Sequence, residues 1–104
     1  TYYRYLVIRE LNLSLSGDKV FDIGCYDGFL LSHVNSKLKS GIDINTVNKF
    51  SDIRYIQDDF LNHDFENEKF DRIFALDVLE HVKQDKEFLG KVVHLLWPIL
   101  PGFR

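Results

Sequence analysis

The sequence predicts an α/β fold, a three-layer sandwich built on a parallel sheet of roughly four strands. Two observations carry this prediction. The run 19–23 is apolar toward both sides, as in a central strand that helices cover on both faces. Short strand-like runs then recur at 41–44, 54–57 and 70–76, with segments of helical spacing before the first and after the last. Right-handed crossovers between such units leave few topologies open.

The N-terminal third is expected to hold a helix, a turn, a strand and a second helix. Residues 2–12 place apolar side chains at helical spacing, which predicts an amphipathic helix. Residues 14–18 predict a turn with Gly-Asp as the breaker, and strand 19–23 follows. Apolar residues repeat every three or four positions over 28–38, which predicts a helix that ends in cationic residues and a glycine.

The middle of the chain predicts two short strands and the loops around them. Residues 41–44 form a short strand, and the polar pair after it is suited to cap a helical turn over 45–50. Residues 54–57 predict the third strand, with two acidic residues at its end. Residues 61–69 are polar and predict a loop.

The last third predicts a strand and two helices. Residues 70–76 form the fourth strand, and residues 77–82 form a short helix. A longer helix spans 85–96, where Asp85 is suited to cap the N-terminus. The buried face of this helix is expected to consist of Phe88, Leu89, Val92, Val93 and Leu96.

Size and composition restrict the function. The chain of 104 residues is expected to form one domain over 1–104. Its net charge of −3 gives no electrostatic basis for binding nucleic acid. No run reaches the roughly 20 apolar residues that span a bilayer, so no membrane contact is expected. The single cysteine excludes an internal disulfide and fits a reducing cytoplasm.

The C-terminal segment 97–104 is apolar, interrupted by proline, and ends where a further strand is expected. We therefore expect the domain to be incomplete at its C-terminus. A sheet that ends there would have an uncovered edge, which a second copy of the chain would be suited to cover as a homo-oligomer.

The turn after the first strand is the strongest functional signal. Asp22 precedes it, and Gly24 and Gly28 allow a ligand to approach the backbone, with helix-start N–H groups pointing at that ligand. Asp43 ends the next strand, 21 residues after Asp22. This is roughly the offset at which α/β nucleotide folds present a carboxylate to a ribose hydroxyl. The alternative is a plain strand-to-helix turn beside a solvated acid.

Four segments carry motifs in a recognisable order. They are 20–28 (Val-Phe-Asp-Ile-Gly-Cys-Tyr-Asp-Gly), 41–45 (Gly-Ile-Asp-Ile-Asn), 55–60 (Tyr-Ile-Gln-Asp-Asp-Phe) and 70–82, which ends in Asp-Val-Leu-Glu-His-Val. In this order the chain resembles the class I S-adenosylmethionine-dependent methyltransferases, closest to the branch that acts on small molecules. The resemblance covers 19–97 and implies a Rossmann-like fold, of which this chain would be the N-terminal part.

The resemblance implies S-adenosylmethionine as cofactor and assigns it a set of contacts. Asp43 would accept hydrogen bonds from both ribose hydroxyls, and Ile44 would lie against the adenine. Asp59 would accept from the adenine amino group, with a solvated surface acid as the alternative. The other implied contacts lie around the methionine moiety, the adenine or the methyl-donor pocket: Asp22, Gly24, Cys25, Tyr26, Gly28, Phe60, Leu76 and Asp77. Asp77 is equally suited to cap a helix.

Cys25 and Tyr26 lie between the two glycines of the turn. Tyr26 stands where glycine is commonest in the family, and a positive φ there would cost a tyrosine about 1 kcal/mol. Cys25 is interpreted as a small packing residue and not as a nucleophile, because no histidine is paired with it in the sequence.

The acceptor side of the reaction is weakly marked. The resemblance implies methyl transfer to an unidentified small molecule, which needs donor and acceptor to be held close and collinear. His81 is the candidate general base, although Leu-Glu-His often has a structural role in this family. His33, His63 and His94 lack the spacing of metal ligands, so no metal is expected.

Two other functions stay open from the sequence. One is a non-catalytic, cofactor-binding fragment that relies on a partner chain or a swapped copy of itself. The other is an NAD-binding Rossmann domain, against which the missing third glycine of Gly-x-Gly-x-x-Gly counts.

Overall fold

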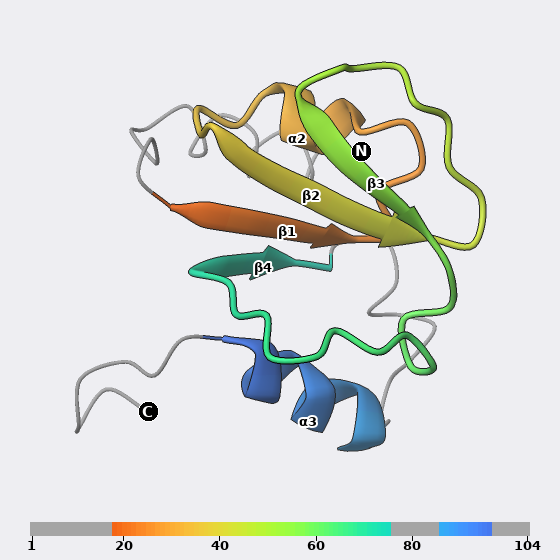
Figure 1. The fold of residues 1–104 in the computed structure, drawn as a ribbon, viewed down its shortest axis with the longest axis vertical. Helices are drawn as coiled ribbons and strands as arrows, with labels where there is room; N and C mark the ends of the chain where they lie inside the picture. Colours follow the sequence, from red (N-terminus) through yellow and green to blue (C-terminus); the bar gives the residue numbers. More distant parts are fainter. Residues whose placement is uncertain (1–17, 76–85, 97–104) are drawn as a thin grey trace, which may run out of the picture.

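Four parallel strands form one sheet in the order β3-β2-β1-β4 in the computed structural model, which describes residues 18–75 and 86–96 (Figure 1). The strands are β1 (Lys19–Ile23), β2 (Leu38–Asp43), β3 (Ile53–Gln57) and β4 (Arg72–Phe74). The predicted α/β fold with a parallel, Rossmann-like sheet is confirmed. The order runs outward from β1 to β3 and then returns to β4, so the strand order reverses beside β1. In open α/β sheets, ligands bind at such a reversal, outside the carboxyl ends of the strands.

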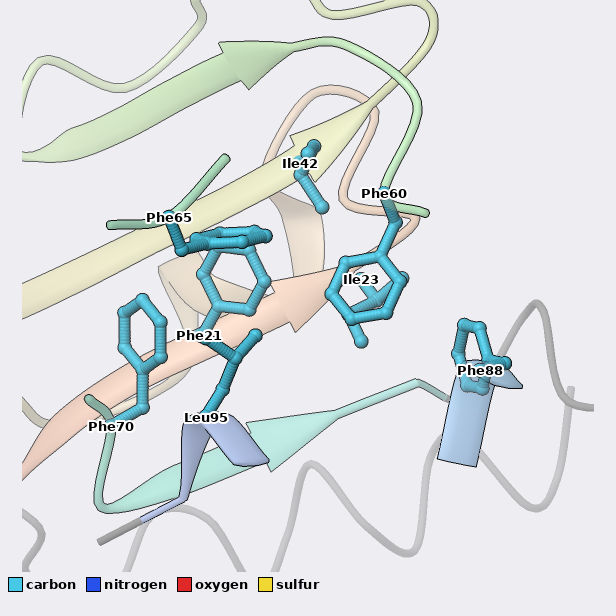
Figure 2. Close-up of a cluster of buried hydrophobic side chains, with 8 residues drawn as sticks. All are labelled: Phe21, Ile23, Ile42, Phe60, Phe65, Phe70, Phe88 and Leu95. Carbon is cyan, nitrogen blue, oxygen red and sulfur yellow. The ribbon is translucent and has the colours of Figure 1, made fainter. Parts of the chain in front are cut away.

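Helices α2 (Phe29–Ser32) and α3 (Lys86–Leu95) cover opposite faces of the sheet (Figure 1). Alternation along β1 separates two apolar clusters, with Phe21 and Ile23 on the α3 side and Val20 on the α2 side. The α3-side cluster consists of Phe21, Ile23, Ile42, Phe60, Phe65, Phe70, Phe88 and Leu95 (Figure 2). The α2-side cluster consists of Val20, Cys25, Leu30, Leu31, Val34 and Ile53.

Aromatic rings fill the α3-side cluster. Phe21 stacks on Phe70 with ring centroids 4.5 Å apart and meets the edge of Phe65 at 5.4 Å. Figure 2 shows Phe70 at one end of this cluster and Phe60 and Phe88 at the other, near the carboxyl end of β1. Contacts of this kind hold the 60–70 loop segment on the sheet.

The helix predicted over 28–38 is wrong in its length, because α2 ends at Ser32 and Leu38 already belongs to β2. The apolar spacing that suggested more helix belongs to the buried Val34, which lies beyond the helix end. Lys39 reaches back from β2 and donates to the carbonyls of Leu31 and Val34 at 2.9 and 3.3 Å. A cation thus stabilises the end of the helix, but it comes from a strand.

The strand predicted over 41–44 begins earlier, at Leu38, and Gly41 lies inside it. A Cβ on Gly41 would lie 2.5 Å from Cys25 Cβ and 3.1 Å from the Asp22 carbonyl oxygen. The glycine is therefore required because the Cys25 side chain, in the turn after β1, packs directly against β2, and it does not terminate a helix.

Three other boundaries differ from the prediction. Segment 45–50 forms no helical turn, because Val47 N–H donates to the Tyr26 carbonyl at 3.1 Å. The fourth strand covers only Arg72–Phe74, and Phe70 forms an isolated bridge with Leu96. The strand at 54–57 and the loop at 61–69 are confirmed, with β3 starting one residue earlier.

The predicted buried face of α3 is partly wrong. Leu89 and Val93 are exposed, whereas Phe88, Val92 and Leu95 contribute to the α3-side cluster. This spacing of four and three residues makes one stripe along a helix. The predictions for 2–12, 77–82 and Asp85 lie outside the described residues. No helix in the described parts of the chain is long and apolar enough to cross a membrane.

Candidate functional site

A pocket of about 410 Å³ opens at the carboxyl ends of β1, β2 and β3. Its lining is largely apolar and includes three carboxylates, but, among the residues described, no lysine or arginine. The lining residues are Ile23, Gly24, Tyr26, Ile42, Asp43, Ile44, Asp58, Asp59, Phe60, Leu61 and Phe88. The pocket thus lies outside the carboxyl ends of the strands, where open α/β sheets bind ligands.

Asp43 joins the ends of β1 and β2 through its carboxylate. Its Oδ2 accepts a hydrogen bond from the backbone N–H of Tyr26 at 2.9 Å, and its Oδ1 accepts one from Asn45 N–H at 3.1 Å. Each carboxylate oxygen has a second acceptor position. Asp43 thus holds the turn after β1 in place and retains acceptor capacity at the pocket that it lines.

The turn after β1 uses its own N–H groups to keep its shape. Gly24 and Cys25 donate to the Ile42 carbonyl at 2.8 and 3.2 Å, and Gly28 donates to the Cys25 carbonyl at 2.8 Å. At the start of α2, Phe29 N–H donates to the Asp27 carboxylate at 3.0 Å. Of the helix-start N–H groups that the sequence predicted to point at a ligand, that of Phe29 is therefore already used within the turn.

Tyr26 has φ 48, in the left-handed region, between Gly24 and Gly28 with φ 84 each. The positive φ considered from the sequence is therefore present at a tyrosine. The Tyr26 side chain is 54% exposed and lines the pocket. Hydrogen bonds of the Tyr26 N–H and carbonyl groups hold this strained backbone and so keep an aromatic side chain at the pocket rim, where glycine would leave the rim open.

Tyr55 of β3 binds the turn on the side away from the pocket through its hydroxyl group. Tyr55 Oη donates to the Asp27 carbonyl at 2.7 Å and accepts from Phe50 N–H at 3.2 Å. A Cβ on Gly28 would lie 2.6 Å from this hydroxyl. Hydrogen bonds of this one hydroxyl therefore connect the turn, the 44–50 loop and β3 behind the pocket.

Two adjacent acids after β3 lie at the pocket, each with an internal partner. Asp58 Oδ2 lies 2.8 Å from His63 Nδ1, and this hydrogen bond, together with that from Asp59 N–H, lowers the pKa of Asp58. Asp59 accepts from Leu61 N–H at 3.3 Å and from the Asn62 side chain at 2.6 Å. Both acids shape the loop that they occupy and line the pocket.

Comparison with known proteins identifies the family. A family profile described as "Methyltransferase domain" matches residues 21–98. The chain belongs to this methyltransferase family. It is also similar to N-methyltransferase 4 of Papaver somniferum, with 33% identity over 92 residues, covering 73% of this chain and 26% of that protein. The chain thus spans about a quarter of the length of this curated relative. The predicted resemblance to class I S-adenosylmethionine-dependent methyltransferases is confirmed.

The methyltransferase domain brings together about half of the residues assigned to the cofactor from sequence. The residues that line the pocket are Gly24, Tyr26, Asp43, Ile44, Asp59 and Phe60. Asp22, Cys25 and Gly28 lie in the supporting strand and turn and are buried. Leu76, Asp77 and His81 lie outside the described residues.

Five further residues of the methyltransferase domain line the pocket without having been predicted to: Ile23, Ile42, Asp58, Leu61 and Phe88. Ile23 and Ile42 are the residues at or next to the ends of strands, and Asp58 and Leu61 flank assigned residues, so proximity in sequence was the available signal. Phe88 comes from α3, and no local pattern relates it to the other residues of the pocket.

Cys25 of the methyltransferase domain is a packing residue. It is 5% exposed, and burial raises its thiol pKa to about 12, with the charges of Asp22 and Asp43 adding to the effect. A protonated, enclosed thiol is a poor nucleophile at neutral pH. Among the described residues, no group of three or more potential ligands is suited to hold a metal ion.

Proposed function

We propose that this methyltransferase domain binds S-adenosylmethionine in the pocket at the ends of β1, β2 and β3, for methyl transfer to a small molecule. The observation that carries the proposal is Asp43. Its carboxylate lines the pocket while both oxygens are fixed by N–H groups at 2.9 and 3.1 Å. A carboxylate held in this way has one acceptor position left on each oxygen, which suits the two neighbouring hydroxyls of a ribose.

The rest of the pocket fits the other parts of this cofactor. A volume of about 410 Å³ lies within the range of small-ligand sites. Ile44, Phe60 and Phe88 provide apolar surface for a flat base, and Asp59 provides an acceptor for an amino group. Three carboxylates favour a positively charged ligand by Coulomb attraction and oppose a pyrophosphate, so they count against NAD.

The work of the protein in such a reaction is to hold and align. When bound, the sulfonium cofactor supplies a methyl group that is already activated for displacement. Asp43, Ile44 and Asp59 would hold this cofactor in the pocket and so would fix the position from which its methyl group is offered to an acceptor. Alignment of donor and acceptor lowers the activation free energy by several kcal/mol. The name of the poppy relative, an N-methyltransferase, makes amines the first acceptors to test.

Calorimetric titration tests the binding step. We expect micromolar affinity for S-adenosylmethionine and S-adenosylhomocysteine and far weaker binding of NAD. Tighter binding of NAD would contradict the proposal. Transfer of a labelled methyl group to a panel of small amines then tests turnover, and folded protein that binds the cofactor without transfer would favour the non-catalytic alternative.

A further inference from the structure

Lys91 on α3 directs its ammonium group at one loop. Its Nζ donates to the backbone carbonyls of Phe60, Leu61 and His63 at 2.6, 3.1 and 2.7 Å. An ammonium has three N–H donors, so these bonds use the whole donor capacity of the side chain. Lys91 thus connects the middle of α3 with a loop that lies 28 to 31 residues earlier in the sequence.

Two aromatic rings of the same region reinforce this contact. The Lys91 ammonium lies 5.2 Å from the ring centroid of Phe60 and 5.3 Å from that of Phe65. Both separations are within the range of cation–π attraction. The ammonium is therefore enclosed by carbonyl oxygens and ring faces, and its position on the loop is well defined.

The loop that Lys91 holds is one wall of the pocket. Asp58, Asp59, Phe60 and Leu61 all line it. Phe88, one helical turn before Lys91, lines the same pocket and meets Phe60 with ring centroids 5.1 Å apart. Helix α3 thus supplies part of the wall through Phe88 and fixes the rest through Lys91.

We infer that Lys91 is a positioning residue, which sets the adenine-side wall of the cofactor pocket by holding the loop that carries Asp59 and Phe60. The inference rests on the proposed function. Lys91 is absent from the pocket lining, so it acts through the loop and not on the ligand. Without the ammonium, three carbonyls lose their common donor and the loop becomes less ordered in the free protein. Part of the free energy of cofactor binding is then used to order the loop, so the affinity falls.

The experiment compares Lys91→Met with Lys39→Met. Methionine keeps the apolar stem and removes the donors. Lys39 is the control, because its buried ammonium also donates to two backbone carbonyls, those of Leu31 and Val34, but on the α2 side and outside the pocket. It differs from Lys91 in a further ion pair, with Asp52 at 3.1 Å. Affinity for S-adenosylhomocysteine is measured by calorimetry at a temperature where circular dichroism shows every variant folded.

Lys91→Met is expected to weaken the affinity about tenfold or more, the loss typical of one charge-assisted hydrogen bond or more. Lys39→Met is expected to lower the melting temperature while the affinity stays within about twofold of wild type. Lys91→Arg should recover part of the affinity, because it keeps the charge but presents a planar fork to three converging carbonyls.

Each other outcome has a distinct meaning. Wild-type affinity in folded Lys91→Met, or an equal loss of affinity in Lys39→Met, overturns the positioning role. If Lys91→Met does not fold, Lys91→Gln decides, because its amide keeps two N–H donors at most and no charge, and wild-type affinity in that variant overturns the inference. Wild-type protein that does not bind S-adenosylhomocysteine overturns the proposed function, and this inference with it.

Discussion

The backbone N–H of Tyr26 donates a hydrogen bond to the carboxylate of Asp43 at 2.9 Å. This bond connects the turn after β1 with the end of β2, so the residue proposed to hold the ribose also fixes the shape of the turn. The two roles follow from the parallel sheet, because the carboxyl ends of neighbouring strands meet at one edge.

Asp43→Ala is therefore expected to affect binding and stability together. Loss of charge-assisted hydrogen bonds should weaken cofactor affinity by roughly 1.5–3 kcal/mol, and the unpaired N–H groups should lower the free energy of unfolding by about 1–2 kcal/mol. Calorimetry and urea denaturation measure the two effects. Asp64→Ala is the control, since that carboxylate accepts from Glu66 N–H at 2.8 Å but does not line the pocket. Equal affinities of the Asp43 and Asp64 variants would remove Asp43 from the site.

The backbone of Tyr26 predicts an order of stability among substitutions. At φ 48, a β-branched residue is strained and glycine is not. We expect Tyr26→Gly and Tyr26→Asn to be at least as stable as wild type, and Tyr26→Val to be less stable by about 1 kcal/mol. The midpoint of urea unfolding with an unchanged m-value reports this order. A valine variant as stable as the glycine variant would show that the positive φ is absent in solution.

Burial of Cys25 predicts a pH dependence at alkaline pH. The pKa of its thiol rises from an ordinary 9.0 to about 12, so the folded state keeps the proton that the unfolded state releases. Between pH 9 and 12 the folded state binds more protons, and stability falls with rising pH by up to about 1.4 kcal/mol per pH unit. Below pH 9 the thiol adds no pH dependence.

Cys25→Ala isolates this contribution, because other groups that titrate at alkaline pH are common to both proteins. The difference in free energy of unfolding between wild type and variant, measured from pH 8 to 11, should shrink as the pH rises above about 9. Slow alkylation of the native thiol at pH 8 and fast alkylation in urea would agree with this. A difference that is constant over the whole range would contradict it.

The sequence was sufficient for the elements that depend on local pattern. β1 has the predicted bounds because its residues are apolar toward both clusters, and β3 differs by one residue. The helix predicted over 28–38 is too long because two residues that suggested a longer helix, Val34 and Gly41, are needed for contacts between distant segments. Val34 is buried beyond the helix end, and Gly41 is needed beside Cys25 in a strand.

The candidate site divides in the same way. Asp43 and Ile44 follow directly from strand ends in an α/β pattern, so position in the sequence was enough to find them. From α3, Phe88 reaches the pocket and Lys91 reaches the loop that forms one of its walls, and their contacts with Phe60 cross 28 and 31 residues. Such contacts depend on how a helix is placed on the sheet, which local spacing does not specify.

Gly28 offers the sharpest test of the supporting turn. Its φ of 84 is unfavourable for any residue with a Cβ, and that Cβ would lie 2.6 Å from Tyr55 Oη and 2.8 Å from Ile53 Cδ1. Backbone strain and overpacking should together lower the free energy of unfolding of Gly28→Ala by roughly 2–4 kcal/mol. Urea denaturation measures the loss.

Gly90→Ala is the matched control for this substitution. Gly90 lies within α3, and a Cβ there would meet nothing within 4 Å. Alanine should stabilise this helix by up to about 1 kcal/mol, so the same chemical change has opposite signs at the two glycines. In a double-mutant cycle, Tyr55→Phe should reduce the cost of Gly28→Ala, because it removes the hydroxyl that the new methyl group meets. A Gly28→Ala variant as stable as wild type would mean that the turn does not adopt this backbone conformation.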